Sequence, residues 1–352
     1  MMSDDMITIQ PAHSQLKDWE LLLRKCSSPL IYFTHSWSHF IQKVTGATEH
    51  HMIAYQGENP VGFLPLWSTK SGPNIVMNSQ PWYGTHGGCL LVDPSQDDVR
   101  ASLLAAAAKK IKELQASAFT CILTPSEEAH RSLYQSQLET TTFDSRIGQI
   151  STLPRQSQSE DSPHSLILQH VKQKTRNLIR KSLKQDFEVH RDSSEESWRF
   201  LFDEHQKGIL AKGGQPKPWS HFTALRETIP MDQVRLYIAT HESTKVAALL
   251  LLRYRDTVEY LTPVTSVDWR AKQPLSFLIY HAMADAISDG YSTWNWGGTW
   301  HTQHSLHHFK RGWGAEDKEY SYVIYARESL IKSLQAERMS VPWFYLYPYD
   351  KL

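Results

Sequence analysis

The segment from Pro274 to Gly290 limits the possible folds more than any other part of the chain. Its apolar residues recur at helical spacing and share one face: Leu275, Leu278, Ile279, Ala282, Met283, Ala286 and Ile287. Proline suits the first turn of a helix, and glycine suits its C-terminal stop. Strand-like segments lie before it at residues 234–240, 246–254 and 258–263, and after it at 293–296. A helix placed between strands in this way predicts a mixed α/β fold.

A polar segment, PRQSQSEDSPHS, divides the chain into two halves that follow a similar order of elements. In each half, antiparallel hairpins are followed by a helix and a returning strand. We therefore predict an α/β (α+β) protein with two tandem domains, each a mixed, mainly antiparallel sheet flanked by helices. The predicted parts are an N-terminal domain at 1–153, a linker at 154–165, a C-terminal domain at 166–335 and a tail at 336–352.

Composition excludes several classes of protein. The 37 Lys and Arg balance the 37 Asp and Glu, so no global charge draws the chain to nucleic acid, and DNA is not an expected partner. The three cysteines have no metal-ligand spacing and suit a reducing compartment. The longest apolar run, Val246 to Leu252, is far shorter than the ~20 residues of a membrane helix. The N-terminus has no signal-like apolar run, and we expect a cytoplasmic protein.

Two arginines on a basic segment, which we predict to be a helix over residues 166–184, are candidates for binding phosphate. Arg176 and Arg180 are four residues apart and share one helical face. With Thr175 they are suited to hold a diphosphate, because a guanidinium can donate two parallel hydrogen bonds to the oxygens of one phosphate. The alternative is a solvated cationic face.

Four further side chains are candidates for catalysis, each with a plainer alternative. Lys310 is suited to stabilise a developing oxyanion or a phosphate leaving group, or it is a solvated lysine. Asn295 precedes two glycines, where it would hold substrate or cap a turn. His205 would be a base near pH 7, or simply a buried or surface ring. Tyr260, on a central strand, would shuttle a proton or pack in the core.

Four histidines cluster near Lys310 and invite a zinc interpretation: His301, His304, His307 and His308. No carboxylate or cysteine lies near them at ligand spacing, so we expect no metal. In the first half, Tyr83 opens a glycine-rich turn, YGTHGG. This turn would line an acceptor site, or it is a tight turn that needs positive φ angles.

Several motifs taken in order carry a family resemblance: PWYGTHGG at 81–88, TRNLIRKSLKQDFEV at 175–189, NWGGT at 295–299 and FKRGWGAEDKEYSY at 309–322. In this order they resemble the FemAB-like branch of the GNAT acyltransferase superfamily. The resemblance covers about three quarters of the chain. The Trp-Gly form of the last motif looks closer to the relatives associated with exopolysaccharide genes.

This resemblance implies a twin GNAT fold and transfer of an acyl group to an amine. The acceptor would be an amino sugar, or a nucleotide- or lipid-linked saccharide, for envelope or extracellular polysaccharide. The donor would be acyl-CoA, with acetyl-CoA the first choice. A lipid-linked acceptor would bring the protein to the membrane surface.

The resemblance also assigns roles to particular residues. It places Lys310 at the reaction centre. We expect residues 307–320 to lie between two strands, with Phe309 and Trp313 shaping the turn that presents Lys310. Arg270 falls where a typical GNAT loop holds the pyrophosphate of coenzyme A. The glycines of that loop are missing from residues 270–276, which puts coenzyme A use in doubt.

Two other functions remain open. Relatives that build peptidoglycan bridges take an amino acid from aminoacyl-tRNA and attach it to a peptidoglycan precursor. The coiled-coil arm of some tRNA-using relatives is absent here, which makes tRNA the less favoured partner. The second alternative is a non-catalytic GNAT-like binding protein, which the missing glycine loop motivates.

Overall fold

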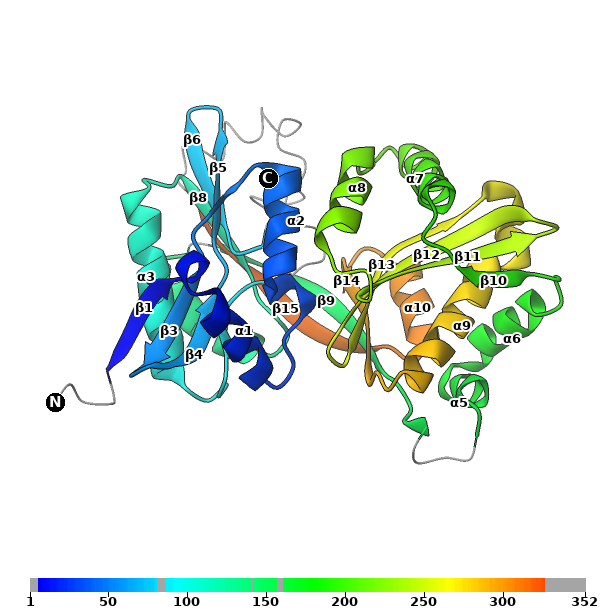
Figure 1. The fold of residues 1–352 in the computed structure, drawn as a ribbon, viewed down its shortest axis with the longest axis horizontal. Helices are drawn as coiled ribbons and strands as arrows, with labels where there is room; N and C mark the ends of the chain where they lie inside the picture. The colour runs from blue at the N-terminus through cyan, green and yellow to red at the C-terminus, as the bar shows by residue number, and fades with distance from the viewer. Residues whose placement is uncertain (1–5, 81–85, 141, 157–160, 327–352) are drawn as a thin grey trace. The chain divides into compact units, whose positions relative to one another are not determined.

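The computed structural model describes residues 6–80, 86–140, 142–156 and 161–326, and the chain forms two compact units (Figure 1). One unit comprises Met1–Arg146 with Glu319–Leu352, and the other comprises Ile147–Lys318. Strands β9 (Thr142–Thr152) and β15 (Glu316–Ala326) each contain a boundary between units. The division into domains, linker and tail at 153, 165 and 335 stays a prediction, and the tail lies outside the described residues.

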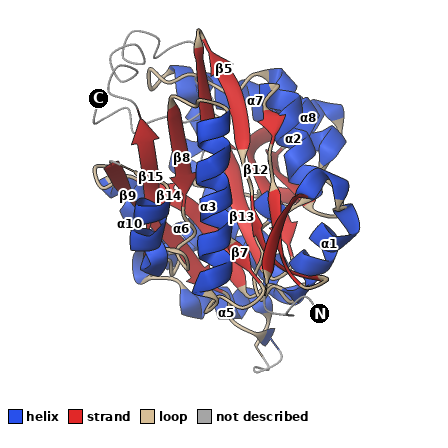
Figure 2. Cartoon of the chain, turned by 90° about the vertical axis from the view of Figure 1, so that its left-hand side faces the viewer, coloured by secondary structure: helices blue, strands red, loops and turns tan. Residues whose placement is uncertain are grey.

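The first unit holds two groups of strands and four described α-helices. The helices are α1 (Leu16–Lys25), α2 (His35–Thr45), α3 (Asp97–Glu113) and α4 (Arg131–Gln137). The strands are β1 (Ile7–Pro11), β2 (Thr48–Glu49), β3 (Met52–Gln56), β4 (Asn59–Leu64), β5 (Trp67–Ser71), β6 (Asn74–Asn78), β7 (Leu90–Leu91) and β8 (Ala118–Ile122). One sheet has the order β1-β3-β4-β7, and a second run has the order β15-β8-β6-β5-β2. Figure 2 shows α3 lying in front of the strands of this unit.

Helix α3 owes its position to an apolar face packed on β1, β3 and β4. Leu103, Leu104 and Ala107 are fully buried in the core of this unit. Next to that face lies Arg100, also fully buried, whose Nε donates to Glu127 at 2.8 Å. A cation can be buried in such a core only because it is paired.

The second unit is one mixed sheet with helices on both faces. Its helices are α5 (Pro163–His170), α6 (Gln173–Ser182), α7 (Glu195–Leu210), α8 (Trp219–Thr228), α9 (Pro274–Ser288) and α10 (His304–Gly312). Its strands, besides β9, are β10 (Glu188–Arg191), β11 (Val234–His241), β12 (Thr244–Tyr254), β13 (Thr257–Thr265) and β14 (Thr293–Thr299). The order is β10-β11-β12-β13-β14-β9. Helices α7 and α8 cover one face, and α5, α6 and α9 cover the other (Figure 1). Short 3₁₀ turns lie at Ala12–Ser14, Ile31–Phe33, Glu128–His130 and Val267–Lys272.

The helix predicted after Pro274 is α9, and its position is confirmed. Leu278, Ile279 and Met283 are fully buried against the sheet. The helix connects β13 to β14, which is the parallel pair in this sheet. A crossover helix is the usual way to join two parallel strands.

Strands β13 and β14 pair over only a short length. Thr257–Glu259 of β13 pairs with Thr293–Asn295 of β14, and each strand then runs on without that partner. Beyond this point the register of β14 with β9 shifts between Asn295 and Gly298. The two strands therefore part at Asn295, and the candidate site lies around this point.

Two predicted elements differ in the structure. The basic helix expected over 166–184 is two helices, because Val171 adopts an extended conformation between α5 and α6. The stretch at 307–320, expected to be a turn between two strands, begins inside helix α10 and continues into β15. Within the described ranges, no helix is both long and apolar enough to span a membrane.

Candidate active site

Lys310 lies on α10 with its side chain directed at the end of β14. Its Nζ donates to the carbonyl oxygens of Gly297 at 3.2 Å and Gly298 at 3.1 Å, and to Thr299 Oγ1 at 2.8 Å. Only 3% of the residue is exposed. Lys310 forms no ion pair with any described residue. A lysine buried without a carboxylate is rare, because burial of an unpaired charge is unfavourable.

The protonation of Lys310 is set by two opposing effects. Three acceptors surround Nζ, which matches the three N–H groups of an ammonium. Burial favours the neutral amine and lowers the pKa of Lys310 to about 7. The group can therefore change its charge near neutral pH, which is typical of residues at functional sites.

A buried polar network continues behind Lys310. Thr299 Oγ1 donates to Gln149 Oε1 at 2.8 Å, and Gln149 Nε2 donates to Asp317 Oδ1 at 3.3 Å. Thr299 and Gln149 are both fully buried. The sequence prediction missed this network. Thr299 stood inside the NWGGT motif, but nothing in the sequence connects Gln149 with it.

Asn295 uses its side chain inside its own turn. Its Oδ1 accepts a hydrogen bond from the backbone N–H of Gly297 at 2.9 Å, and the residue is buried. Gly297 has φ +71°, a left-handed conformation that glycine adopts without strain. The turn aims the carbonyl groups of Gly297 and Gly298 at Lys310. These contacts match the plainer alternative for Asn295, a residue that caps a turn.

An aromatic wall adjoins this turn. The Trp296 ring lies 4.9 Å from Tyr260, 6.1 Å from Phe309 and 6.2 Å from Trp313, between ring centroids. Trp313 is fully buried and Phe309 partly so, which suits packing that positions α10. Burial raises the pKa of Tyr260 far above its usual value. Tyr260 would therefore keep its proton and act as a hydrogen-bond donor.

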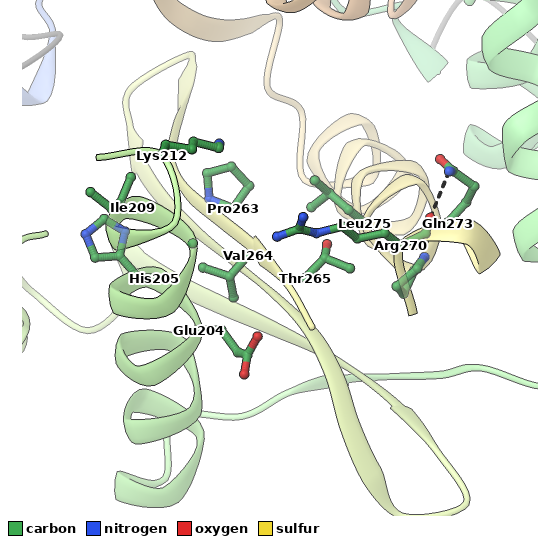
Figure 3. A pocket seen from close by; sticks show the side chains of 12 residues that line it. Glu204, His205, Ile209, Lys212, Pro263, Val264, Thr265, Arg270, Gln273 and Leu275 are labelled. Atoms are coloured by element: carbon green, nitrogen blue, oxygen red, sulfur yellow. Dashed lines mark hydrogen bonds between the residues drawn. The ribbon is translucent and has the colours of Figure 1, made fainter. Parts of the chain in front are cut away.

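His205 and Arg270 line one pocket, although they lie far apart in the sequence. The pocket has a volume of about 390 Å³ and lies between α7, the end of β13 and the start of α9. Figure 3 shows His205 on the α7 side and Arg270 on the α9 side, with Pro263, Val264 and Thr265 between them. No side chain in the described part of the chain caps the first N–H groups of α9. An uncapped helix start next to an arginine is suited to hold phosphate.

The ring of His205 already takes part in a hydrogen bond within the protein. Its Nε2 accepts a hydrogen bond from the backbone N–H of Lys217 at 3.1 Å. Burial, with a smaller effect of the Lys217 charge, lowers the pKa of His205 to about 4. The ring is neutral at pH 7, and Nε2 could take a proton only if this backbone contact opened.

The predicted phosphate-binding residues on α6 differ in exposure and in contacts, and their role stays a prediction. Arg180 is exposed, whereas Arg176 is partly buried and its Nη1 donates to the Leu168 carbonyl at 2.9 Å. Thr175 is 5% exposed and lies against Gly312 of α10. Tyr83, the candidate from the first half, lies outside the described residues.

Among the described residues, no group of three or more His, Cys, Asp or Glu is placed to hold a metal ion. Within the histidine cluster, His307 Nε2 contacts Asp317 at 2.9 Å and His308 Nδ1 donates to the carbonyl of His304 at 2.7 Å. These rings take part in side-chain and helix contacts. The absence of a metal from the function stays a prediction.

Comparison with known proteins shows which family and which solved structures this fold resembles. Residues 169–311, all within the second unit, match the family described as acetyltransferase (GNAT) domain. The chain matches no curated protein by sequence. The crystal structure of FemX superimposes with a TM-score of 0.71 at 13% identity, covering 94% of this chain and 99% of that one.

Two further solved structures agree. A tandem GNAT protein from the clavulanic acid biosynthesis pathway gives a TM-score of 0.57 at 10% identity, covering 91% of this chain and 97% of that one. The C-terminal domain of a putative lysylphosphatidylglycerol synthetase from Agrobacterium fabrum gives 0.54 at 11% identity, covering 92% and 96%.

The chain therefore has a GNAT-type acyltransferase fold, and the predicted class of two tandem GNAT-like domains is confirmed. More particularly, the fold is FemAB-like, as the likeness to FemX shows. The family match supports a transferase.

Proposed function

We propose that the chain is an N-acyltransferase that moves an acyl group from acyl-CoA, with acetyl-CoA the first choice, to a primary amine. The acceptor is an amino sugar, or a nucleotide- or lipid-linked saccharide, for envelope or extracellular polysaccharide made from the cytoplasmic side. The single observation that carries the proposal is Lys310, a buried lysine held by three acceptors where β13 and β14 part.

The proposed reaction is direct transfer. The neutral amine of the acceptor attacks the thioester carbonyl, the new C–N bond forms, and the C–S bond breaks to release the coenzyme A thiolate. The proton lost by the amine goes to that thiolate or to solvent. Lys310, as an ammonium, stabilises the negative charge that develops on the carbonyl oxygen. The network through Thr299 and Gln149 holds Lys310 in place.

The pocket beside α9 is the proposed donor site. Arg270 and the uncapped start of α9 supply positive charge for a pyrophosphate, in place of the glycine loop of a typical GNAT. Lys212 lines the same pocket and adds a cation. Glu204 also lines it, and its carboxylate is paired with Lys207 at 2.8 Å. The residues present therefore suit a pyrophosphate without the glycines.

Aminoacyl transfer from tRNA to a peptidoglycan precursor is the alternative. The likeness of fold to FemX and to a domain of a putative lysylphosphatidylglycerol synthetase favours it. The uncapped α9 and Arg270 accommodate any phosphate-bearing donor and do not separate the two. A non-catalytic GNAT-like binding protein is the third possibility.

A donor experiment separates these functions. The purified chain is incubated with a panel of acyl-CoAs or with aminoacyl-tRNA, together with nucleotide amino sugars or a peptidoglycan precursor, and products are identified by mass spectrometry. We expect an N-acylated sugar and free coenzyme A, and weaker transfer when Arg270→Ala removes the cation. Product only from aminoacyl-tRNA would replace the proposal with the alternative. No product from any donor would leave the binding protein.

A further inference from the structure

A pocket in the first unit is lined by none of the residues that the proposed reaction uses. It lies between the C-terminal half of α3, the end of β1 and the segment that joins β2 to β3, and its volume is about 370 Å³. Four apolar residues line it: Ile9, Pro11, Met52 and Ala106. Glu49 lines it as well. We call it the α3–β2 pocket, and its volume lies within the range typical of small-molecule sites.

Glu49 brings to this pocket a carboxylate that has no partner among the described residues. The residue ends β2, where its backbone pairs with Trp67 of β5. Its Oε1 is shielded from solvent, and its side chain forms no hydrogen bond or ion pair within the described part of the chain. The terminal torsion of a glutamate turns easily, so either oxygen can face the pocket. A shielded carboxylate oxygen without a donor is unfavourable unless a ligand or a proton satisfies it.

The two lysines at the pocket lie on α3, and both approach Glu113 of the same helix. Lys110 Nζ donates to Glu113 at 2.8 Å, and Lys109 Nζ lies 3.9 Å from that carboxylate. The Lys109 side chain is 78% exposed, so water and salt screen its charge. Neither lysine therefore neutralises Glu49, and neither prevents a second cation from reaching it.

Three histidines line the pocket, and none of them is paired with Glu49. His51 is 1% exposed, and both of its ring nitrogens form hydrogen bonds inside the unit. His50 Nε2 forms a hydrogen bond with Ser68 Oγ at 2.8 Å. Burial, with a smaller effect of a nearby lysine, lowers the pKa of His50, so this ring is neutral at pH 7. His13 is exposed and forms no ion pair with a described residue.

We propose that the α3–β2 pocket binds a small organic ammonium, with its charged nitrogen on the Glu49 carboxylate and its apolar body against the four apolar side chains. An ammonium offers three N–H donors, and a carboxylate accepts them in strong, charge-assisted hydrogen bonds. A metal ion is the less suitable cation, because no described group of three His, Cys, Asp or Glu is placed to hold one. The proposal stands on this pocket alone and does not depend on the transferase function.

A binding titration with three probes that share one apolar chain tests the ligand class. Hexylamine, hexan-1-ol and hexanoate are titrated into the full chain at about pH 8 and followed by saturation-transfer NMR. Hexylamine keeps its charge there, because an alkyl amine has a pKa near ~10.4. We expect saturable binding of hexylamine and about tenfold weaker binding of hexan-1-ol, which lacks the charge. Hexanoate should not bind, because its charge repels Glu49.

Variants of the chain then locate the site. Glu49→Gln keeps the shape of the side chain and should bind hexylamine no better than hexan-1-ol. Glu58→Gln, which changes an exposed residue outside the pocket, is the matched control and should bind as wild type does. Ala106→Leu fills part of the pocket without changing Glu49, and should weaken the binding of the amine and of the alcohol alike.

Binding of hexylamine should follow the ionisation of Glu49. Burial raises the pKa of Glu49 to about 7, so its carboxyl group is mostly protonated at pH 6 and mostly ionised at pH 8. The affinity of wild type for hexylamine should therefore rise about tenfold between these two pH values. In Glu49→Gln it should stay flat. A rise that persists in this variant would come from another group, such as His13, and would contradict the role of Glu49.

Three results would overturn the proposal. They are no binding of hexylamine, equal binding of hexylamine and hexan-1-ol by wild type, and equal binding of hexylamine by wild type and Glu49→Gln. In each case Glu49 would be an acid that is satisfied by its own proton. None of these measurements needs turnover, so the outcome is independent of the proposed enzyme.

Discussion

At the scale of single residues, the site depends on how one lysine is held. Lys310 is held by three hydrogen bonds and is buried, and these two effects act on its pKa in opposite directions. The sequence motif predicted Lys310 as the residue to test. It could not predict the acceptors, because they depend on the turn at Gly297 and on how α10 lies against the end of β14. The role of Lys310 in catalysis stays a proposal.

The pH dependence of transfer should reveal which form of Lys310 is active. If the ammonium stabilises the oxyanion, kcat/KM should fall as pH rises through about 7, where Lys310 loses its proton. Thr299→Val removes one acceptor of the ammonium and should move this fall to lower pH. A rate that instead rises through pH 7 and is lost in Lys310→Ala would make the neutral amine the active form, acting as a base.

The low pKa of Lys310 should also make the free energy of unfolding depend on pH. The pKa of Lys310 is about 7 in the folded chain, against about 10.4 in an unfolded one. Between these values the unfolded chain binds the extra proton, so the free energy of unfolding should rise with pH. Relative to Lys310→Met, wild type should gain up to about 1.4 kcal/mol per pH unit from pH 7.5 to 9.5. Urea denaturation measures this, and a difference that stays constant with pH would contradict the low pKa.

At the scale of elements, the helices and strands that could be predicted were those whose sequence pattern lies within the element itself. Helix α9 follows from seven apolar residues on one face, and its ends follow from Pro274 and Gly290. Helix α10 was predicted as a turn. Its sequence is rich in histidine and is flanked by glycines, and it has no series of apolar residues at helical spacing. Strand β9 was missed, since its polar sequence becomes a strand by pairing with its neighbours β14 and β15. The network through Gln149 depends on that pairing and could not be foreseen.

The turn in β14 offers a test of how an element positions Lys310. Gly297 has φ +71° and open space around its Cβ position, so Gly297→Ala meets backbone strain and no clash. We expect a loss of roughly 1 kcal/mol in the free energy of unfolding. We also expect a clear loss of transfer, because the carbonyl groups that hold Lys310 would shift.

Gly290→Ala is the matched control. Gly290 also has a positive φ, +83°, and open space, but it ends α9 away from Lys310. It should lose similar stability and keep its activity. Equal activity in the two variants would show that the turn at Gly297 does not position the lysine.

At the scale of the whole molecule, each unit has its own core and its own buried polar group. Two tandem domains were predicted from the repeated order of elements, and their GNAT-like fold from the family resemblance. The comparisons confirm this fold. What the sequence could not show is that the chain returns to the first unit at its end, where β15 pairs with β8. Such a pairing between distant segments leaves no local signal in the sequence.

The buried ion pair of the first unit should be important for stability. Arg100 is fully buried, and its partner Glu127 also accepts a hydrogen bond from Tyr134 at 2.5 Å. Arg100→Met leaves that carboxylate buried without its cation and should cost about 3–5 kcal/mol of unfolding free energy. Arg24→Met disrupts an exposed pair with Glu20 and should change stability by less than about 1 kcal/mol. Similar stability losses in both variants, by urea denaturation, would contradict the role given to this pair.

The most direct test of the central claim is the rate of acyl transfer by Lys310→Ala, measured with the donor and acceptor that wild type uses. If Lys310 stabilises the charge of the transition state, kcat should fall by at least ~100-fold. Lys184→Ala, which removes an exposed lysine from the same unit, should transfer at the wild-type rate. A Lys310→Ala variant that folds and transfers at a near-normal rate would contradict the account.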